Sequence, residues 1–380
     1  MLSQAEISWL PFATPAISQP SPQRKIPAPP PGGTMGFVVT EFVSPIVPGQ
    51  DACPHGTAPR LRELYLRSLP EAEQARLRLK ENELELTKGW HGYAFDGKGA
   101  NVCSQPDMFN RSPFPAVESR NGMGLDLDGG ATDADTCAHD NFQSPAGERG
   151  IDNQEYRALG CTLEWRGADG NGGDTLRGMK QFFVSGEWTQ VLLLKGVDSL
   201  TRDDDVEVIY ANTPDRPVID TKDNWLPGTS FTISDTGARH RNVLHGRIVD
   251  GVLTTDPADI RLAQTWGQGV PRDIRGARST YDYQKGRLRL EFQPDGGLRG
   301  YIGGYRDVYN VIISTMLGGE GSALSAGIDC SATLATLKKY ADGIRDPKSG
   351  KCTAVSSAMR MTAIPAFVTD IPAATRSALR

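Results

Sequence analysis

Acidic side chains cluster between residues 124 and 154, where seven carboxylates accompany a single arginine, Arg149. Calcium takes about six to eight oxygen ligands, and carboxylates two residues apart can turn toward one ion where glycines let the backbone wrap. Gly129 and Gly130 supply that freedom, and a divalent cation would offset the repulsion between the packed carboxylates. We therefore predict a calcium site formed by Asp126, Asp128, Asp133, Asp135, Asp152 and Asn153.

The spacing differs from that of an EF-hand, which needs glycine at the sixth loop position and glutamate at the twelfth. Counted from Asp126, the first glycine is fourth and Cys137 is twelfth. A solvated loop, in which Asp and Gly simply form turns, is the alternative interpretation. His139 beside the acidic residues raises a third possibility, a transition-metal ligand. If calcium binds, its first role is to order the loop and stabilise the fold.

Three glutamates are the best candidates for catalysis. A glycoside hydrolase needs two carboxylates about 5–9 Å apart across a groove. A carboxylate next to an aromatic ring could have a raised pKa and face a sugar. The alternative is a strand in which glutamate points outward and the aromatic residue points inward. The glutamates are Glu164, Glu187 and Glu291, and each precedes an aromatic residue, Trp165, Trp188 and Phe292 respectively.

Two tryptophans, Trp225 and Trp266, lie in Gly- or Pro-rich surroundings typical of loops. There they could stack on a sugar or another flat ligand, although packing in the core is the ordinary alternative. The sequence contains neither a C-x-x-C-H haem motif nor a complete nucleotide-binding glycine motif. We therefore expect neither a haem nor a nucleotide cofactor.

The six cysteines are widely spaced in a chain rich in glycine and proline, which favours three disulfides and an oxidising compartment. Six reduced thiols in a cytosolic protein are the alternative. Six cysteines allow fifteen pairings, so sequence cannot decide among them. Proximity along the chain favours Cys330–Cys352 and Cys137–Cys161, which leaves Cys53 with Cys103.

Strand patterns dominate the middle of the chain. Residues 36–47, 181–197, 205–211, 229–235, 242–249 and 287–292 alternate or are rich in β-forming residues. Asp250-Gly251, Lys285-Gly286 and Asp295-Gly296 predict tight hairpin turns, because such turns need a positive φ. The fold class predicted is mainly β: an antiparallel sandwich or barrel with a few short helices and a long Asp-rich loop.

Helical patterns flank this β region. Residues 60–86 show Leu61, Leu64 and Tyr65 on one face, and a break at Pro70 precedes a second helix with a Ser68/Glu71 capping box. A helix over 331–344 carries Ser331 as its expected N-cap. The domain organisation predicted is a disordered Pro-rich tether (1–34), strand and helices (35–123), acidic cation-binding loop (124–161), antiparallel β domain (162–327), helix and strand (328–372) and tail (373–380).

The net charge of the chain is −5, and the acidic stretch alone contributes −6, so the acidity is local. This distribution argues against a nucleic-acid partner. The sequence lacks an apolar run long enough to span a membrane. Its first residues do not resemble a signal peptide, which conflicts with export, but the cysteines favour a periplasmic or extracellular location.

Several motifs resemble a set found in uncharacterised exported bacterial proteins. They are DLDGG, Cys-Ala-His, SPAGERGIDNQ, ALGC and ADGIRDPKSGKCTAVSSA. The resemblance covers about residues 36–368. The resemblance implies export and no particular activity. We therefore expect an exported, calcium-stabilised binding or structural protein whose partner is a glycan or an envelope component. A glycoside hydrolase acting on polysaccharide is the alternative.

Overall fold

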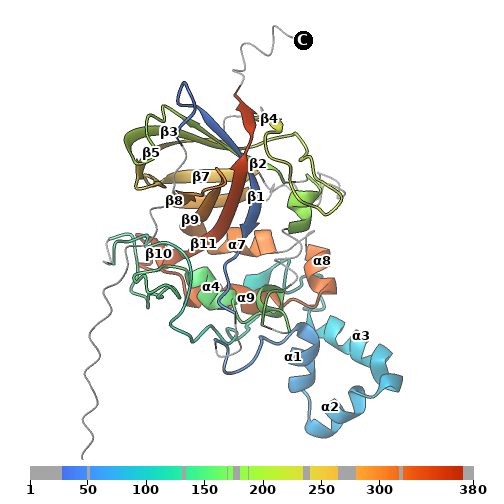
Figure 1. The fold of residues 1–380 in the computed structure, drawn as a ribbon. Coiled ribbons are helices and arrows are strands. Elements are labelled where there is room, and N and C mark those ends of the chain that lie inside the picture. The colour runs from blue at the N-terminus through green and yellow to red at the C-terminus, as the bar shows by residue number, and fades with distance from the viewer. Residues whose placement is uncertain are drawn as a thin grey trace, which may run out of the picture.

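Eight antiparallel strands form a closed barrel in the computed structural model (Figure 1). Each strand pairs with the next in order, and β1 pairs with β11 to close the ring. The sequence left a sandwich or a barrel open, and the structure selects the barrel. The structure describes residues 28–48, 52–130, 134–168, 170–173, 180–186, 188–233, 240–263, 280–315 and 320–370. In barrel order the strands are β1 (Met35–Val43), β2 (Gln190–Lys195), β3 (Arg202–Asn212), β5 (Arg241–Val249), β6 (Val252–Thr255), β8 (Thr280–Phe292), β9 (Leu298–Asp307) and β11 (Cys352–Pro365).

Alternation along the strands fills the interior of the barrel. In β5, buried and exposed residues alternate over most of the strand, as expected where one face of a sheet meets the core. Aromatic side chains are prominent in the interior, and the ring of Phe42 meets that of Trp188 edge-on at 5.1 Å. The outer face of β8, β9 and β11 carries exposed arginines, Arg289, Arg299 and Arg360.

Within the described residues, four further strands lie outside the ring of eight. β7 (Ala258–Ala263) pairs with β8, and β10 (Gly343–Arg345) pairs with the beginning of β11. β4 (Ser230–Thr232) and β12 (Phe367–Thr369) form a small parallel sheet. β10 matters for the site below, because it brings the end of the last helix to β11.

Short helices lie below the barrel in Figure 1, and α1, α2 and α3 project as a separate arm. The arm holds together through Leu66, Leu77 and Leu86, one from each helix. Its α2 begins after Pro70 without the predicted Ser68/Glu71 capping box, since the Ser68 hydroxyl donates to the Tyr65 carbonyl. The helices are α1 (Leu61–Arg67), α2 (Glu71–Leu77), α3 (Glu83–Tyr93), α4 (Gln154–Leu159), α5 (Leu163–Arg166), α7 (Val308–Thr315), α8 (Glu320–Ser325) and α9 (Cys330–Lys339), with 3-10 turns at Lys80–Asn82 and Pro106–Met108. No helix within the described ranges is both long and apolar enough to cross a membrane.

Two of the three predicted turns are confirmed. Asp250 and Gly251 both have positive φ and join β5 to β6, and Gly296 does the same between β8 and β9. The Lys285-Gly286 prediction is wrong, because this step lies inside β8. Lys285 has φ 51° there, and the pairing register shifts between Gln284 and Arg287. A bulge thus uses the same backbone freedom that a turn would need.

All six cysteines form disulfides, as predicted. The pairing favoured by proximity is wrong in every case: the bonds are Cys53–Cys161, Cys103–Cys330 and Cys137–Cys352. They span 108, 227 and 215 residues, so each one ties together distant parts of the chain. The third bond fastens the acidic region to the first residue of β11.

The N-cap of α9 is Asp329, one residue before the helix and two before the predicted Ser331. Its Oδ1 accepts the Ala332 N–H at 3.0 Å, and its Oδ2 lies 3.1 Å from Arg111 Nε. We expect Asp329→Ala to lower stability by about 1–2 kcal/mol, as the loss of an N-cap does. Thermal melting should show Asp329→Asn losing less, because asparagine keeps the capping oxygen. Equal losses would assign the stabilisation to the Arg111 pair instead.

Candidate metal centre

The centre lies where residues 134–153 pass the start of β11. Cys137 is bonded to Cys352 there, and the Gln154 N–H donates to the Ser356 hydroxyl of β11 at 2.9 Å. From the barrel, Arg287 of β8 donates to the Leu127 carbonyl at 2.8 Å. Isolated bridges, Leu125 to Asp152 among them, complete the framework. The functional side chains therefore sit on irregular backbone that the barrel and a disulfide hold in place.

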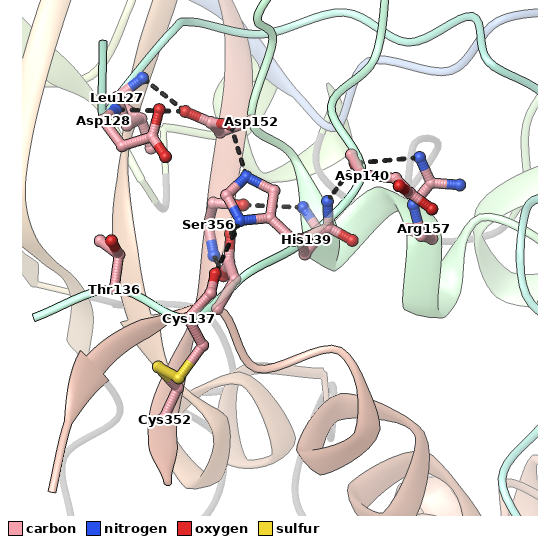
Figure 2. Close-up of polar contacts among 12 residues, drawn as sticks. Leu127, Asp128, Thr136, Cys137, His139, Asp140, Asp152, Arg157, Cys352 and Ser356 are labelled. Atoms are coloured by element: carbon pink, nitrogen blue, oxygen red, sulfur yellow. Dashed lines mark hydrogen bonds and ion pairs between the residues drawn. A yellow bond between two sulfur atoms is a disulfide. The ribbon is translucent and has the colours of Figure 1, made fainter. Parts of the chain in front are cut away.

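His139 is the central side chain, and both of its ring nitrogens are engaged (Figure 2). Nδ1 donates to the Cys137 carbonyl at 3.0 Å, and Nε2 lies 2.8 Å from Asp152 Oδ1. The side chain of His139 is 8% exposed and that of Asp152 is fully buried. In metal sites, a backbone carbonyl that accepts from one ring nitrogen commonly directs the other toward the ion.

Asp152 and Asp128 face the same point as His139. Asp152 Oδ2 accepts the backbone N–H groups of Leu127 and Asp128 at 2.7 and 3.3 Å, which leaves Oδ1 directed at the imidazole. One ligand atom each from Asp128, His139 and Asp152 lies within 4.8 Å of the others. This is the one His/Cys/Asp/Glu group of that kind among the residues that the structure describes. It offers one nitrogen and two carboxylates to a cation.

A third carboxylate, Asp342, reaches the centre from the turn before β10. Its Oδ1 accepts the Ser356 N–H at 2.6 Å, and its Oδ2 lies 3.8 Å from His139 Nδ1. Oδ2 is buried and has no hydrogen-bond partner within the described part of the chain. Sequence reasoning did not identify Asp342. Its only signal was membership in the ADGIRDPKSGKC motif, since β10 and a distant disulfide are what bring it here.

The electrostatics of the centre favour added positive charge. Burial raises the pKa of Asp342 to about 6, and burial followed by the charge of Asp152 raises the pKa of Asp128. Burial would lower the pKa of His139, but its hydrogen bonds to Asp152 and the Cys137 carbonyl raise that pKa to about 9. In the metal-free protein a proton on His139 therefore provides the balancing charge.

The other predicted calcium ligands have different partners. Asp126 Oδ1 accepts the Gly129 N–H at 2.7 Å, and Asp135 pairs with Lys285 at 2.9 Å. Asn153 caps α4: its Oδ1 accepts the Tyr156 N–H at 3.1 Å, and its Nδ2 donates to the Met123 carbonyl. Asp133 lies outside the described residues. The structure thus brings together Asp128 and Asp152 of the predicted set, with His139 as the third member.

Two of the three candidate catalytic glutamates, Glu164 and Glu291, line separate hollows of the described structure. Glu164 lies in α5, where it pairs with Arg60 at 2.9 Å and lines a small pocket beside Asp329. Glu291 lines a separate groove on the outer face of β8. Glu187 lies outside the described residues. The structure therefore does not place Glu164 and Glu291 across one groove.

Of the two candidate stacking tryptophans, Trp225 is half-buried and packs against two apolar clusters of the barrel. Trp266 lies outside the described residues. The packing of Trp225 matches the alternative interpretation of that residue, a contribution to the core.

The chain has no match among protein-family models, curated proteins or solved structures. The arguments about function therefore rest on the geometry alone. The three disulfides indicate a compartment other than the reducing cytosol.

Proposed function

We propose that this protein is a periplasmic or extracellular β-barrel binding protein in which a divalent cation fastens the acidic segment to the barrel. The observation that carries the proposal is the convergence of Asp128, His139 and Asp152, whose ligand atoms lie within 4.8 Å of one another. The Cys137 carbonyl on Nδ1 supports it, because that contact directs Nε2 at the two carboxylates. The buried Oδ2 of Asp342 adds negative charge beside them.

The donor set favours a transition metal of the zinc type. Imidazole with carboxylates suits zinc and its neighbours, whereas calcium prefers a shell made only of oxygen. Calcium would need Asp126, backbone carbonyls or waters to replace the nitrogen. We therefore place Zn²⁺ first and keep Ca²⁺ as the competing cation in the test.

Burial supports a structural role for the cation. The side chains of His139 and Asp152 are 8% and 0% exposed, so a substrate has little access to an ion between them. A bound cation would instead join Asp128 to His139 and Asp152. The chain around His139 contacts β8 through the Asp135–Lys285 pair and β11 through the Cys137–Cys352 bond. Binding at a hundredfold excess over Kd contributes about 3 kcal/mol to stability.

The experiment strips the purified chain with a chelator, then adds Zn²⁺ or Ca²⁺ and measures bound metal and Tm. We expect one Zn²⁺ per chain and a clear rise in Tm. Asp128→Asn should weaken Zn²⁺ binding by more than the ~10–100-fold that is lost when a group hydrogen-bonded to a metal ligand is removed. Asp135→Asn is the matched control, since Asp135 is exposed on the same segment and pairs with Lys285.

Two results would contradict this proposal. If neither ion binds or changes Tm, the carboxylates around His139 are balanced by its proton alone. If Ca²⁺ stabilises the protein and Asp128→Asn and Asp135→Asn weaken it equally, the ligands are those of the acidic cluster at large.

A further inference from the structure

The Cys137–Cys352 disulfide differs from the other two in its exposure to solvent. Cys137 and Cys352 are both only partly buried. The cysteines of the other two bonds are each 0–8% exposed, namely Cys53, Cys161, Cys103 and Cys330. Thiol–disulfide exchange needs a thiolate to reach one of the two sulfur atoms. The Cys137–Cys352 bond is therefore the one most accessible to a dissolved reductant.

This accessible bond also supports the metal centre. The Cys137 carbonyl accepts from His139 Nδ1 at 3.0 Å, and the Cys137 N–H donates to the Asp342 carbonyl at 2.7 Å. Cys352 is the first residue of β11, the strand whose Ser356 N–H donates to Asp342 Oδ1. Figure 2 shows Cys137 between the disulfide and the imidazole ring. Apart from the main chain, the bond is thus the covalent link between the support of His139 and the barrel.

The neighbouring contacts on this stretch of chain are noncovalent. Asp135 pairs with Lys285, but the two side chains are 61% and 41% exposed, and exposed ion pairs stabilise little. Arg345 of β10 (Gly343–Arg345) donates to the Thr136 carbonyl. Breaking the disulfide therefore leaves the Cys137 peptide group held by hydrogen bonds alone.

Positive charge beside Cys352 favours its sulfur as the leaving group. Arg345 is the partner of Cys352 in the β10–β11 ladder, and Lys351 precedes Cys352 in the chain. A nearby cation stabilises a thiolate, and exchange is faster when the departing sulfur is stabilised in that form. An incoming thiolate is therefore expected to attack Cys137 Sγ while Cys352 Sγ leaves.

We propose that the Cys137–Cys352 bond is a redox switch for the metal centre, and that its reduction by an external dithiol releases the cation. One thiolate of the reductant forms a mixed disulfide with Cys137, and its second thiol then displaces Cys137 as the reductant closes into a disulfide. Two electrons and two protons pass from the dithiol to the protein, which is left with two thiols. The Cys137 carbonyl is then no longer held in place, so His139 Nε2 loses its direction toward the carboxylates. This switch rests on the proposed metal centre and adds its regulation.

The test compares the zinc affinity of the oxidised and the reduced chain. Chelator-stripped protein is treated with dithiothreitol, alkylated with iodoacetamide and freed of both reagents, so that neither thiols nor reductant bind Zn²⁺. Mass spectrometry should find the label on Cys137 and Cys352 before any other cysteine. Titration against a fluorescent zinc indicator should show affinity about 10–100-fold weaker, the loss expected when a group hydrogen-bonded to a metal ligand is removed. Circular dichroism should show that the barrel stays folded, and protein alkylated without reductant is the control.

Two double variants make the same comparison without alkylation. Cys137→Ala/Cys352→Ala should bind Zn²⁺ about as weakly as the reduced chain. Cys103→Ala/Cys330→Ala is the matched control, because its bond spans 227 residues against 215 and lies in a different, apolar cluster. It should keep the affinity of the wild type. If either variant fails to fold, the reduced wild-type chain decides.

Label on another pair first, an unchanged affinity in Cys137→Ala/Cys352→Ala, or an equal loss in both double variants would overturn the switch. Loss of the circular dichroism of the barrel on reduction would overturn it too, because zinc release would then follow from unfolding. Oxidised wild-type protein that binds no Zn²⁺ rejects the metal centre itself. Oxidised protein that binds Zn²⁺ and keeps its affinity after reduction rejects the switch only.

Discussion

Replacing Glu155 by alanine is expected to destabilise the protein by about 3–5 kcal/mol, because it leaves a buried guanidinium without its counter-charge. Both Glu155 oxygens accept from Arg306 Nη1, at 2.9 and 3.1 Å, and the two side chains are 2% and 0% exposed. Arg306 also lies over the Tyr281 ring at 3.9 Å. Burial would lower the pKa of Arg306, but the charge of Glu155 raises it, so the arginine keeps its proton.

Denaturant unfolding of Glu155→Ala and Glu164→Ala provides the comparison. Glu164 also pairs with an arginine, Arg60, but these side chains are 22% and 33% exposed. The loss for Glu164→Ala should therefore stay near 1 kcal/mol or below. A similar small loss for Glu155→Ala would show that water reaches the Glu155–Arg306 pair. The result bears on the metal centre too. Glu155 lies in α4, three residues after Asp152, and its ion pair with Arg306 joins this helix to β9.

Local signals in the sequence identified local structure well. The Asp250-Gly251 step became a hairpin because its positive φ values suit the twist of the flanking strands. Lys285-Gly286 gave the same signal and became a bulge, since a bulge accepts the same dihedral angles. The region 181–197 illustrates a further ambiguity: residues 180–184 are helical and only Gln190–Lys195 forms a strand.

Long-range pairing could not be predicted in the same way. The cost of closing a loop rises only slowly with its length, so proximity is a weak guide to disulfide pairing. The barrel closes through β1 and β11, with Phe37 opposite Pro365. Neither strand belongs to the segment 162–327 that the sequence identified as the β domain. A strand pattern shows which residues face a core, but it does not show which distant strand completes the ring.

The candidate site contains residues that local sequence signals identify and a residue that only long-range pairing brings in. Asp128 and Asp152 were identified because clustered carboxylates need compensation, and His139 because it lies between them in the acidic stretch. Asp342 was not identified, since it reaches the site only through β10 and the packing of β11.

The second large effect concerns pH in chelator-stripped protein. The pKa of His139 is raised from 6.5 to about 9, so the folded state holds this proton more tightly than the unfolded state. The stabilisation is complete below pH 6.5 and is lost as the pH rises to about 9. At 1.36 kcal/mol per pKa unit it amounts to about 3 kcal/mol. The carboxylates facing this proton are Asp128, Asp152 and Asp342.

Denaturant unfolding of the stripped chain at several pH values between 6 and 9.5 would measure this decline. His139→Gln should flatten the profile, whereas His245→Gln should leave it sloped, because the side chain of His245 is 57% exposed. With zinc bound, the wild-type decline should also disappear, since the ion replaces the proton as the balancing charge. A slope that survives in His139→Gln would assign the titration to another group. A slope that zinc leaves unchanged would mean that the proton and the metal do not compete for the same nitrogen.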